Sequence, residues 1–207
     1  MGTAISFAQQ KGGAGKTTLL IHLARAWQLA GKSVALIDLD PQRSLTFWNS
    51  LRTDDAFYCL EGAGWRAGSD IRDTAKSYDY TLIDCPGNAS DLLEAAVRES
   101  AIVLVPCQPS PLDIWASKAI LKMAESEKTP AKVVLNRVPA RGQQVADAIT
   151  SLKEAKAQVL SAKLGNRVAF STKVAQGQTA FEGPGKTKAK AEITAIRKEV
   201  ERNLKKL

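Results

Sequence analysis

Residues 9–18 read QQKGGAGKTT, and this stretch decides the fold. It follows a strand-like apolar run, TAISFA (3–8), and it opens a segment with helical spacing of apolar residues (16–29). Small residues let successive backbone N–H groups converge on phosphate oxygens, and the N-terminus of a helix adds its dipole. The stretch therefore predicts a phosphate-binding loop, in the variant form K-G-G-x-G-K-T-T, which lacks the first glycine of the usual rule.

The residues of this loop have separate predicted roles. Lys16 supplies a positive charge to the β- and γ-phosphates, and Thr17 offers its hydroxyl to Mg²⁺. A purely structural glycine turn would need neither residue, which argues against that alternative. The predicted nucleotide-binding residues are Gly12, Gly13, Ala14, Gly15, Lys16, Thr17 and Thr18. A second lysine, Lys11, has no role in a phosphate loop of the ordinary kind.

Strand-like and helix-like segments alternate along the chain. Strands are predicted at 3–8, 33–39, 80–84, 101–106, 131–136 and 167–170, and helices at 16–29, 89–98, 111–126, 143–155 and 188–204. Most of the strands are continuous apolar runs, which is typical of parallel strands buried on both faces. The alternation predicts one doubly wound α/β domain over residues 1–207, with a mostly parallel sheet flanked by helices. Ligands then bind at the carboxyl ends of the strands.

Three aspartates follow predicted strands at this end of the sheet. Asp38 and Asp40 end the segment SVALIDLD, and Asp84 ends TLID. A carboxylate at the end of a buried strand beside a phosphate loop can hold Mg²⁺, often through water. Each aspartate alone could be an ordinary strand-end residue, but three beside one loop indicate a site.

Composition and charge narrow the class of protein. No apolar run approaches the length needed to cross a bilayer, and no basic-then-apolar leader precedes the first strand, so a cytoplasmic protein is expected. The three cysteines have no metal-binding spacing and are expected to be reduced. Residues 163–207 hold 11 Lys/Arg against 4 Asp/Glu, whereas residues 1–162 hold 18 against 17. This asymmetry favours an anionic partner, with a solvated basic helix face as the alternative.

Four segments resemble the deviant Walker ATPases of the ParA/MinD family. They are KGGAGKTT (11–18), LIDLDPQ (36–42), LIDCPG (82–87) and VPCQPSPLD (105–113), and the similarity continues through VVLNRV (133–138). The chain is most similar to the short ParF-type partition proteins. The resemblance implies a P-loop ATPase with weak intrinsic turnover that uses ATP and Mg²⁺ and forms a homodimer with ATP bound.

The resemblance also gives Lys11 a role. Lys11 occupies the position of the family's signature lysine, which reaches across the ATP-bound dimer to the phosphates held by the other subunit. A second cation supplied in trans would offset repulsion between two anionic nucleotides and stabilise phosphoryl-transfer charge. A solvated loop lysine is the alternative. Residues 106–113 resemble a segment near the nucleotide and the dimer interface.

Further roles follow from matching positions. Asp40 resembles the residue that positions the attacking water, and Asp38 and Asp84 resemble those that serve the Mg²⁺ shell. Asn136 resembles the residue that reads the adenine edge, although it could be a plain turn residue. Gly87 resembles a switch position that senses the γ-phosphate.

The partner remains open between DNA and membrane. The basic residues expected to contact DNA without sequence preference are Lys173, Lys186, Lys188, Lys190, Arg197, Lys198 and Arg202. The apolar stripe Ile193, Ile196, Val200 and Leu204 could suit a MinD-like membrane helix, but it lacks bulky aromatic residues and suits packing on the sheet better. A dethiobiotin-synthetase-like ligase is a third class, although such enzymes lack the signature lysine.

The expected protein is therefore a nucleoid-associated partition or positioning ATPase. A ParB-like or other cargo-linked activator would stimulate hydrolysis, and the cargo could be a plasmid, a chromosome region or a protein cluster. An electron-transfer protein is not supported, because Cys85 and Cys107 do not match the paired cysteines of the nitrogenase iron protein.

Overall fold

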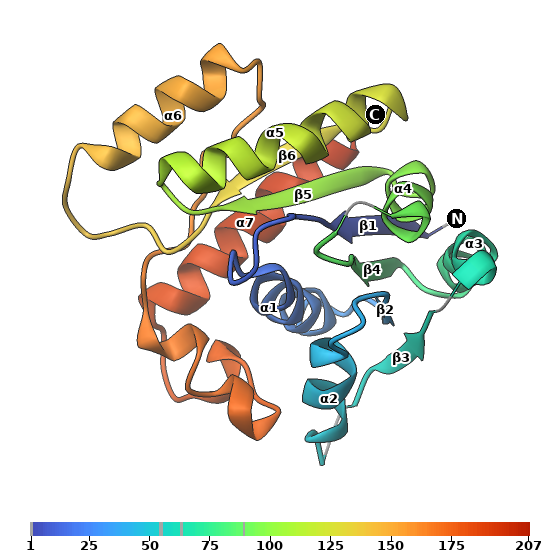
Figure 1. The fold of residues 1–207 in the computed structure, drawn as a ribbon. Helices are drawn as coiled ribbons and strands as arrows, with labels where there is room; N and C mark the ends of the chain where they lie inside the picture. The colour runs from blue at the N-terminus through green and yellow to red at the C-terminus, as the bar shows by residue number, and fades with distance from the viewer. Residues whose placement is uncertain (1, 54–55, 63, 89) are drawn as a thin grey trace.

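A six-stranded parallel sheet forms the centre of the molecule (Figure 1). The computed structural model describes residues 2–53, 56–62, 64–88 and 90–207. The strands are β1 (Thr3–Phe7), β2 (Val34–Asp38), β3 (Tyr58–Glu61), β4 (Tyr80–Asp84), β5 (Ile102–Cys107) and β6 (Ala131–Leu135). Their order across the sheet is β3-β2-β4-β1-β5-β6, so the predicted doubly wound α/β architecture is confirmed.

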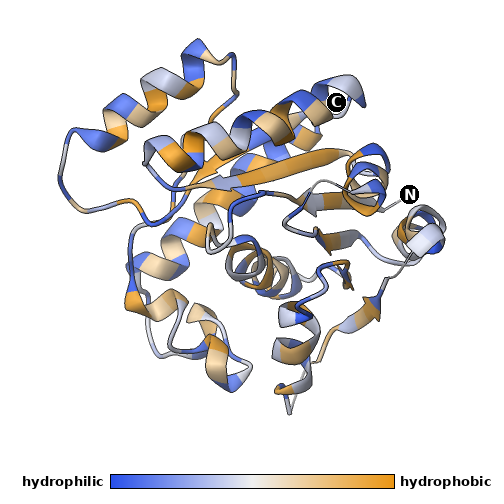
Figure 2. Ribbon diagram, in the orientation of Figure 1, coloured by the Kyte–Doolittle hydropathy of each residue, from blue (hydrophilic) through white to orange (hydrophobic). Residues whose placement is uncertain are grey.

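Helices cover both faces of this sheet. They are α1 (Lys16–Gln28), α2 (Ser44–Ser50), α3 (Ala67–Ser77), α4 (Asp91–Arg98), α5 (Pro111–Ser126), α6 (Gln144–Glu154) and α7 (Lys188–Leu204). Helices α1, α2 and α7 contribute to the hydrophobic core on one face, and α3 to α6 contribute to the core on the other. Strand β5 is hydrophobic along its length, whereas the helices carry polar residues on their outer sides (Figure 2).

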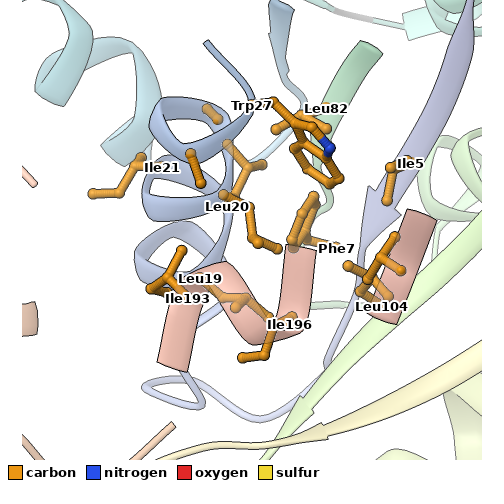
Figure 3. Packing of buried hydrophobic residues seen from close by; sticks show 14 of the residues in the cluster. Ile5, Phe7, Leu19, Leu20, Ile21, Trp27, Leu82, Leu104, Ile193 and Ile196 are labelled. Carbon is orange, nitrogen blue, oxygen red and sulfur yellow. The ribbon is translucent and has the colours of Figure 1, made fainter. Parts of the chain in front are cut away.

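Successive side chains of each strand point alternately into the two cores. In β1, Ile5 and Phe7 enter the core under α1, and Ala4 enters the opposite core. Figure 3 shows Phe7 beside Leu20 of α1, in the core that Ile196 of α7 also enters. Because both faces are covered, the strands read as continuous apolar runs rather than as alternating ones.

Local signals set the helix boundaries. The side chains of Ser90, Ser110 and Thr187 accept hydrogen bonds from backbone N–H groups at the starts of α4, α5 and α7. Gly31, just after α1, has a φ of +78°, a left-handed conformation that glycine adopts readily at the end of a helix.

Three parts of the predicted element order are wrong or incomplete. Residues 167–170 were predicted as a strand, but Val168–Phe170 is a 3₁₀ turn. Arg167 pairs with Glu192 of α7, so this segment is held against a helix rather than against a strand. Strand β3 and helices α2 and α3 were not predicted. The helix predicted from 89 starts at Asp91, and residue 89 itself lies outside the described residues.

The apolar stripe of α7 packs inside the protein. Ile193, Ile196 and Val200 are fully buried, and α7 lies against α1 (Figure 3). The packing role predicted for this stripe is therefore confirmed. Within the described residues, no helix has the length and apolar character required to cross a bilayer.

His22 is a buried titratable group in the core under α1. Its Nδ1 lies 2.7 Å from the carbonyl oxygen of Thr18, and its ring meets that of Phe170 edge-on at 5.2 Å. Burial lowers the pKa of His22 to about 4 from its ordinary value of 6.5. The unfolded chain therefore binds a proton at this histidine in a pH range where the folded chain does not.

This burial predicts a loss of stability in mild acid. As pH falls from 7 to 5, the wild-type free energy of unfolding should fall about 2 kcal/mol further than that of His22→Leu, because only the unfolded wild-type chain gains the proton. His22 is the sole histidine in the sequence, so the difference between the two proteins isolates its contribution. Urea unfolding at both pH values measures it, and parallel pH profiles would contradict the burial argument.

Candidate nucleotide-binding site

The loop between β1 and α1 has the backbone shape of a phosphate cradle. Gly13 and Gly15 have φ values of +75° and +97°, which residues other than glycine rarely adopt. A Cβ on Gly15 would also lie 2.2 Å from the side-chain nitrogen of Asn136. Gly15 is therefore required both for its backbone angle and for the close approach of Asn136.

A cavity of about 480 Å³ lies over this loop at the carboxyl ends of the strands. It is lined by Gln10, Gly12, Gly13, Ala14, Gly15, Lys16, Thr17, Thr18, Asp40, Gln42, Ser44, Gly87, Arg137 and Val174. The structure thus brings all the predicted loop residues together with Asp40 and Gly87. Sequence reasoning did not assign Gln10, Gln42, Ser44, Arg137 and Val174 to the site, because none of them holds a fixed position in a phosphate-loop pattern.

Lysine and carboxylate groups meet at the cavity, which Lys16, Thr17 and Asp40 line, whereas Asp84 is fully buried and does not line it. The ammonium of Lys16 lies 3.7 Å from Asp40, and the hydroxyl of Thr17 donates to Oδ2 of Asp84 at 2.6 Å. Burial raises the pKa of Asp84 to about 7, although the Thr17 hydrogen bond and the Lys16 charge oppose this shift. The other carboxylate oxygen of Asp84, Oδ1, is buried without a hydrogen-bond partner.

These oxygens fit a magnesium ion. Mg²⁺ is bound through one or two protein oxygens together with substrate phosphates and water, so it does not need a full cage of side chains. The hydroxyl of Thr17 and the unpartnered oxygen of Asp84 supply that kind of set. Among the described residues, no group of three or more His, Cys, Asp or Glu residues forms a cation cage.

Asp38 lies beneath the cavity and does not line it. Its carboxylate accepts hydrogen bonds from the backbone N–H and hydroxyl of Thr46, at 2.9 and 3.0 Å, and from the N–H of Asp40 at 3.2 Å. Asp38 therefore braces the turn that carries Asp40. Its predicted place in the Mg²⁺ shell stays a prediction.

Asn136 supports the phosphate loop from the end of β6. Its side-chain nitrogen donates to the carbonyl oxygen of Ala14 at 2.7 Å, and its side-chain oxygen accepts from the N–H of Arg137 at 2.8 Å. Both ends of the amide thus have partners within the chain. The predicted reading of an adenine edge stays a prediction. Arg137 is exposed, has a φ of 50° and lines the cavity, whereas the buried Asn136 does not line it.

The segment 106–113 lies beside the loop. The side chain of Gln108 donates to the carbonyl oxygen of Gly13 at 3.1 Å, and Lys11 forms an ion pair with Asp113 at 2.5 Å. Unlike Lys16, Lys11 is absent from the cavity lining. Gly87 lines the cavity, and a Cβ there would make ordinary contacts, 3.8 Å from the carbonyl oxygen of Gln10 and 3.9 Å from the ammonium of Lys16.

The basic residues predicted to contact DNA fall into two groups. Lys186, Lys188, Lys198 and Arg202 are exposed. The remaining three have partners within the chain. Lys190 donates to the carbonyl oxygens of Gly183 and Gly185, Arg197 pairs with Glu201, and Lys173 donates to Gln178.

Known proteins resemble the chain over most of its length. Residues 5–180 match the model of the CobQ/CobB/MinD/ParA nucleotide binding domain. The chain is 28% identical to the maintenance of carboxysome distribution protein A of Halothiobacillus neapolitanus, over 95% of each chain. It is 31% identical to the protein VirC1 of Rhizobium rhizogenes, over 84% of this chain and 80% of that protein. Apo McdA from Cyanthece has the same fold, with a TM-score of 0.83 at 17% identity over 97% of this chain and all of that one.

Proposed function

The chain belongs to the family of CobQ/CobB/MinD/ParA nucleotide-binding domains, and we propose that it is an ATP-driven positioning ATPase of the ParA type. The observation that carries this proposal is the pair of lysines at one phosphate loop. Lys16 lines the cavity, whereas Lys11 lies outside it on Asp113. One lysine serves the nucleotide of its own subunit, and the other is available for a second subunit.

Hydrolysis of ATP uses groups that line the cavity. Backbone N–H groups of the loop bind the phosphates, and Lys16 offsets their charge. Asp40 orients the attacking water. When bound by Thr17 and Asp84, Mg²⁺ supplies further positive charge to the β- and γ-phosphates.

Dimerisation depends on ATP because Lys11 has a target only when two nucleotides face each other. In the sandwich dimer, Lys11 of each subunit contacts the phosphates bound by the other subunit. ADP lacks the γ-phosphate and offers less charge, so the dimer dissociates after hydrolysis. A cargo-linked protein that stimulates hydrolysis then controls where the dimer persists. The relative from Halothiobacillus neapolitanus is named for the maintenance of carboxysome distribution, and this supports a cargo-positioning role for the present chain.

DNA binding is assigned to the outer side of α7. Lys188, Lys198 and Arg202 are exposed, and none of them takes part in an ion pair among the described residues. Lys198 and Arg202 are four residues apart, so they are neighbours on one helix face. Cations free of carboxylate partners suit phosphate contacts without base readout, and the affinity of such contacts falls steeply with salt.

Charge reversal on α7 tests this function. The double variant Lys198→Glu/Arg202→Glu should bind DNA at least about tenfold more weakly with a slowly hydrolysed ATP analogue. The slope of the logarithm of its DNA affinity against the logarithm of salt concentration should also be shallower by about 4, because two phosphate contacts are lost from each subunit of the dimer. Gel shifts on two unrelated duplexes across a salt series measure both effects, with ADP as the comparison.

The matched control is Lys118→Glu/Lys122→Glu. It changes the net charge equally at two exposed positions four residues apart on α5, which covers the other face of the sheet. Equal weakening by both double variants would show that net charge alone matters. Equal binding with ADP and with the ATP analogue would remove the nucleotide gating.

A further inference from the structure

Lys11 is held by a buried carboxylate of its own subunit. Its ammonium lies 2.5 Å from Oδ2 of Asp113, in the first turn of α5. The side chain of Asp113 is 1% exposed, whereas that of Lys11 is 35% exposed. The pair therefore joins the enclosed carboxylate of Asp113 to a lysine side chain that is partly open to solvent and can move.

The surroundings of Asp113 fix its carboxylate in place. The hydroxyl of Ser110 donates to Oδ2 at 2.5 Å, and it also accepts from the N–H of Asp113 at 3.3 Å. The hydroxyl of Ser117 donates to the carbonyl oxygen of Asp113 at 2.8 Å. The second carboxylate oxygen, Oδ1, is buried without a hydrogen-bond partner.

Lys11 is the one cation that pairs with Asp113 among the described residues. If Lys11 leaves, Asp113 keeps its hydroxyl contact but becomes a buried carboxylate without an opposing charge. Such a carboxylate costs free energy because it is shielded from water. Movement of Lys11 to another anion is therefore opposed by the acid that it leaves behind.

We propose that Asp113 is a positioning residue that holds Lys11 within its own subunit until the nucleotide of a second subunit displaces it. This inference rests on the proposed function, in which Lys11 acts in trans. One ammonium cannot lie against the enclosed Asp113 and against phosphates of another subunit at the same time. Formation of the symmetric dimer breaks two Lys11–Asp113 pairs, so the pair weakens the dimer twice.

Removal of the carboxylate should therefore tighten the ATP-dependent dimer. With a slowly hydrolysed ATP analogue, Asp113→Asn should lower the dimer dissociation constant by about tenfold, or about threefold for each pair no longer broken. Binding of the analogue to dilute, monomeric protein should be unchanged, because Asp113 does not line the cavity. Sedimentation velocity over a concentration series measures the dimer, and a fluorescent nucleotide measures the binding.

Two further variants separate this role from a structural one. Asp113→Leu removes the charge and fills a similar buried volume, so it should also tighten the dimer. It replaces Asp113→Asn as the test variant if Asp113→Asn folds poorly. Ser110→Ala removes the helix cap and leaves the Lys11–Asp113 pair, so it should lower thermal stability without tightening the dimer. A merely structural Asp113 would yield variants that dimerise equally or more weakly.

Lys11→Ala distinguishes failure of the inference from failure of the proposed function. If Lys11→Ala dimerises like the wild type, Lys11 does not act in trans and both ideas fall. Suppose instead that Lys11→Ala fails to dimerise and that both Asp113 variants have a dimer dissociation constant equal to or higher than that of the wild type. Only the holding role of Asp113 is then overturned.

Discussion

Replacement of Asp40 by alanine is expected to lower ATP turnover by about 100-fold or more while nucleotide binding and dimerisation persist. Asp40 lines the cavity, and its carboxylate lies 3.7 Å from the ammonium of Lys16. The phosphate loop does not depend on this carboxylate for its backbone shape. The variant should therefore keep the ATP-bound state and stall in it. Single-turnover phosphate release, compared with equilibrium nucleotide binding, separates the two effects.

Asp40→Asn and Asp38→Asn are the informative controls. Asp40→Asn keeps the volume and one acceptor oxygen, so it shows whether negative charge is needed. Asp38 is buried and braces the backbone of Asp40 and the hydroxyl of Thr46, so Asp38→Asn should lower stability as well as turnover. If Asp40→Ala hydrolyses ATP at the wild-type rate, its contact with Lys16 is only structural and the catalytic assignment is wrong.

The phosphate loop and most of the sheet could be predicted because their signals are local. Glycines with a positive φ, a lysine and a threonine at fixed spacing occur within ten residues, and buried parallel strands are continuous apolar runs. Strand β3 was missed because it lies at the edge of the sheet and its residues are half-buried or exposed. Residues 167–170 have β-rich composition, but the ion pair of Arg167 with Glu192 holds them against α7.

The site was predicted less completely because its remaining contacts join distant parts of the chain. Asp113 is 102 residues from Lys11, and Asn136 is 122 residues from Ala14. No spacing rule connects such residues, so their contacts appear only when the sheet brings the strand ends together. Arg197, whose charge suggested a DNA contact, is a different case, because its partner lies only four residues along the same helix. In the fold it pairs with Glu201, which also accepts a hydrogen bond from Trp27.

Replacement of Lys11 by alanine should abolish ATP-dependent dimerisation at concentrations where the wild type is fully dimeric. Each dimer loses two charge-assisted contacts to phosphate, at about 1.5–3 kcal/mol each, so its dissociation constant should rise by about 100-fold or more. Binding of ATP to the monomer should persist, because Lys16 and the loop remain. Sedimentation with a slowly hydrolysed ATP analogue is the measurement, and Lys16→Ala, which should lose nucleotide binding itself, is the contrasting variant.

Loss of folding would also explain a failure of Lys11→Ala to dimerise, because this variant leaves the buried Asp113 without its cation. The double variant Lys11→Ala/Asp113→Leu removes that unpaired charge and should regain thermal stability close to that of the wild type. It should still fail to dimerise, since no lysine reaches the second nucleotide. A double variant that is stable and also dimerises like the wild type would show that Lys11 has no role in trans, and the ParA-type dimer would need another source of dependence on ATP.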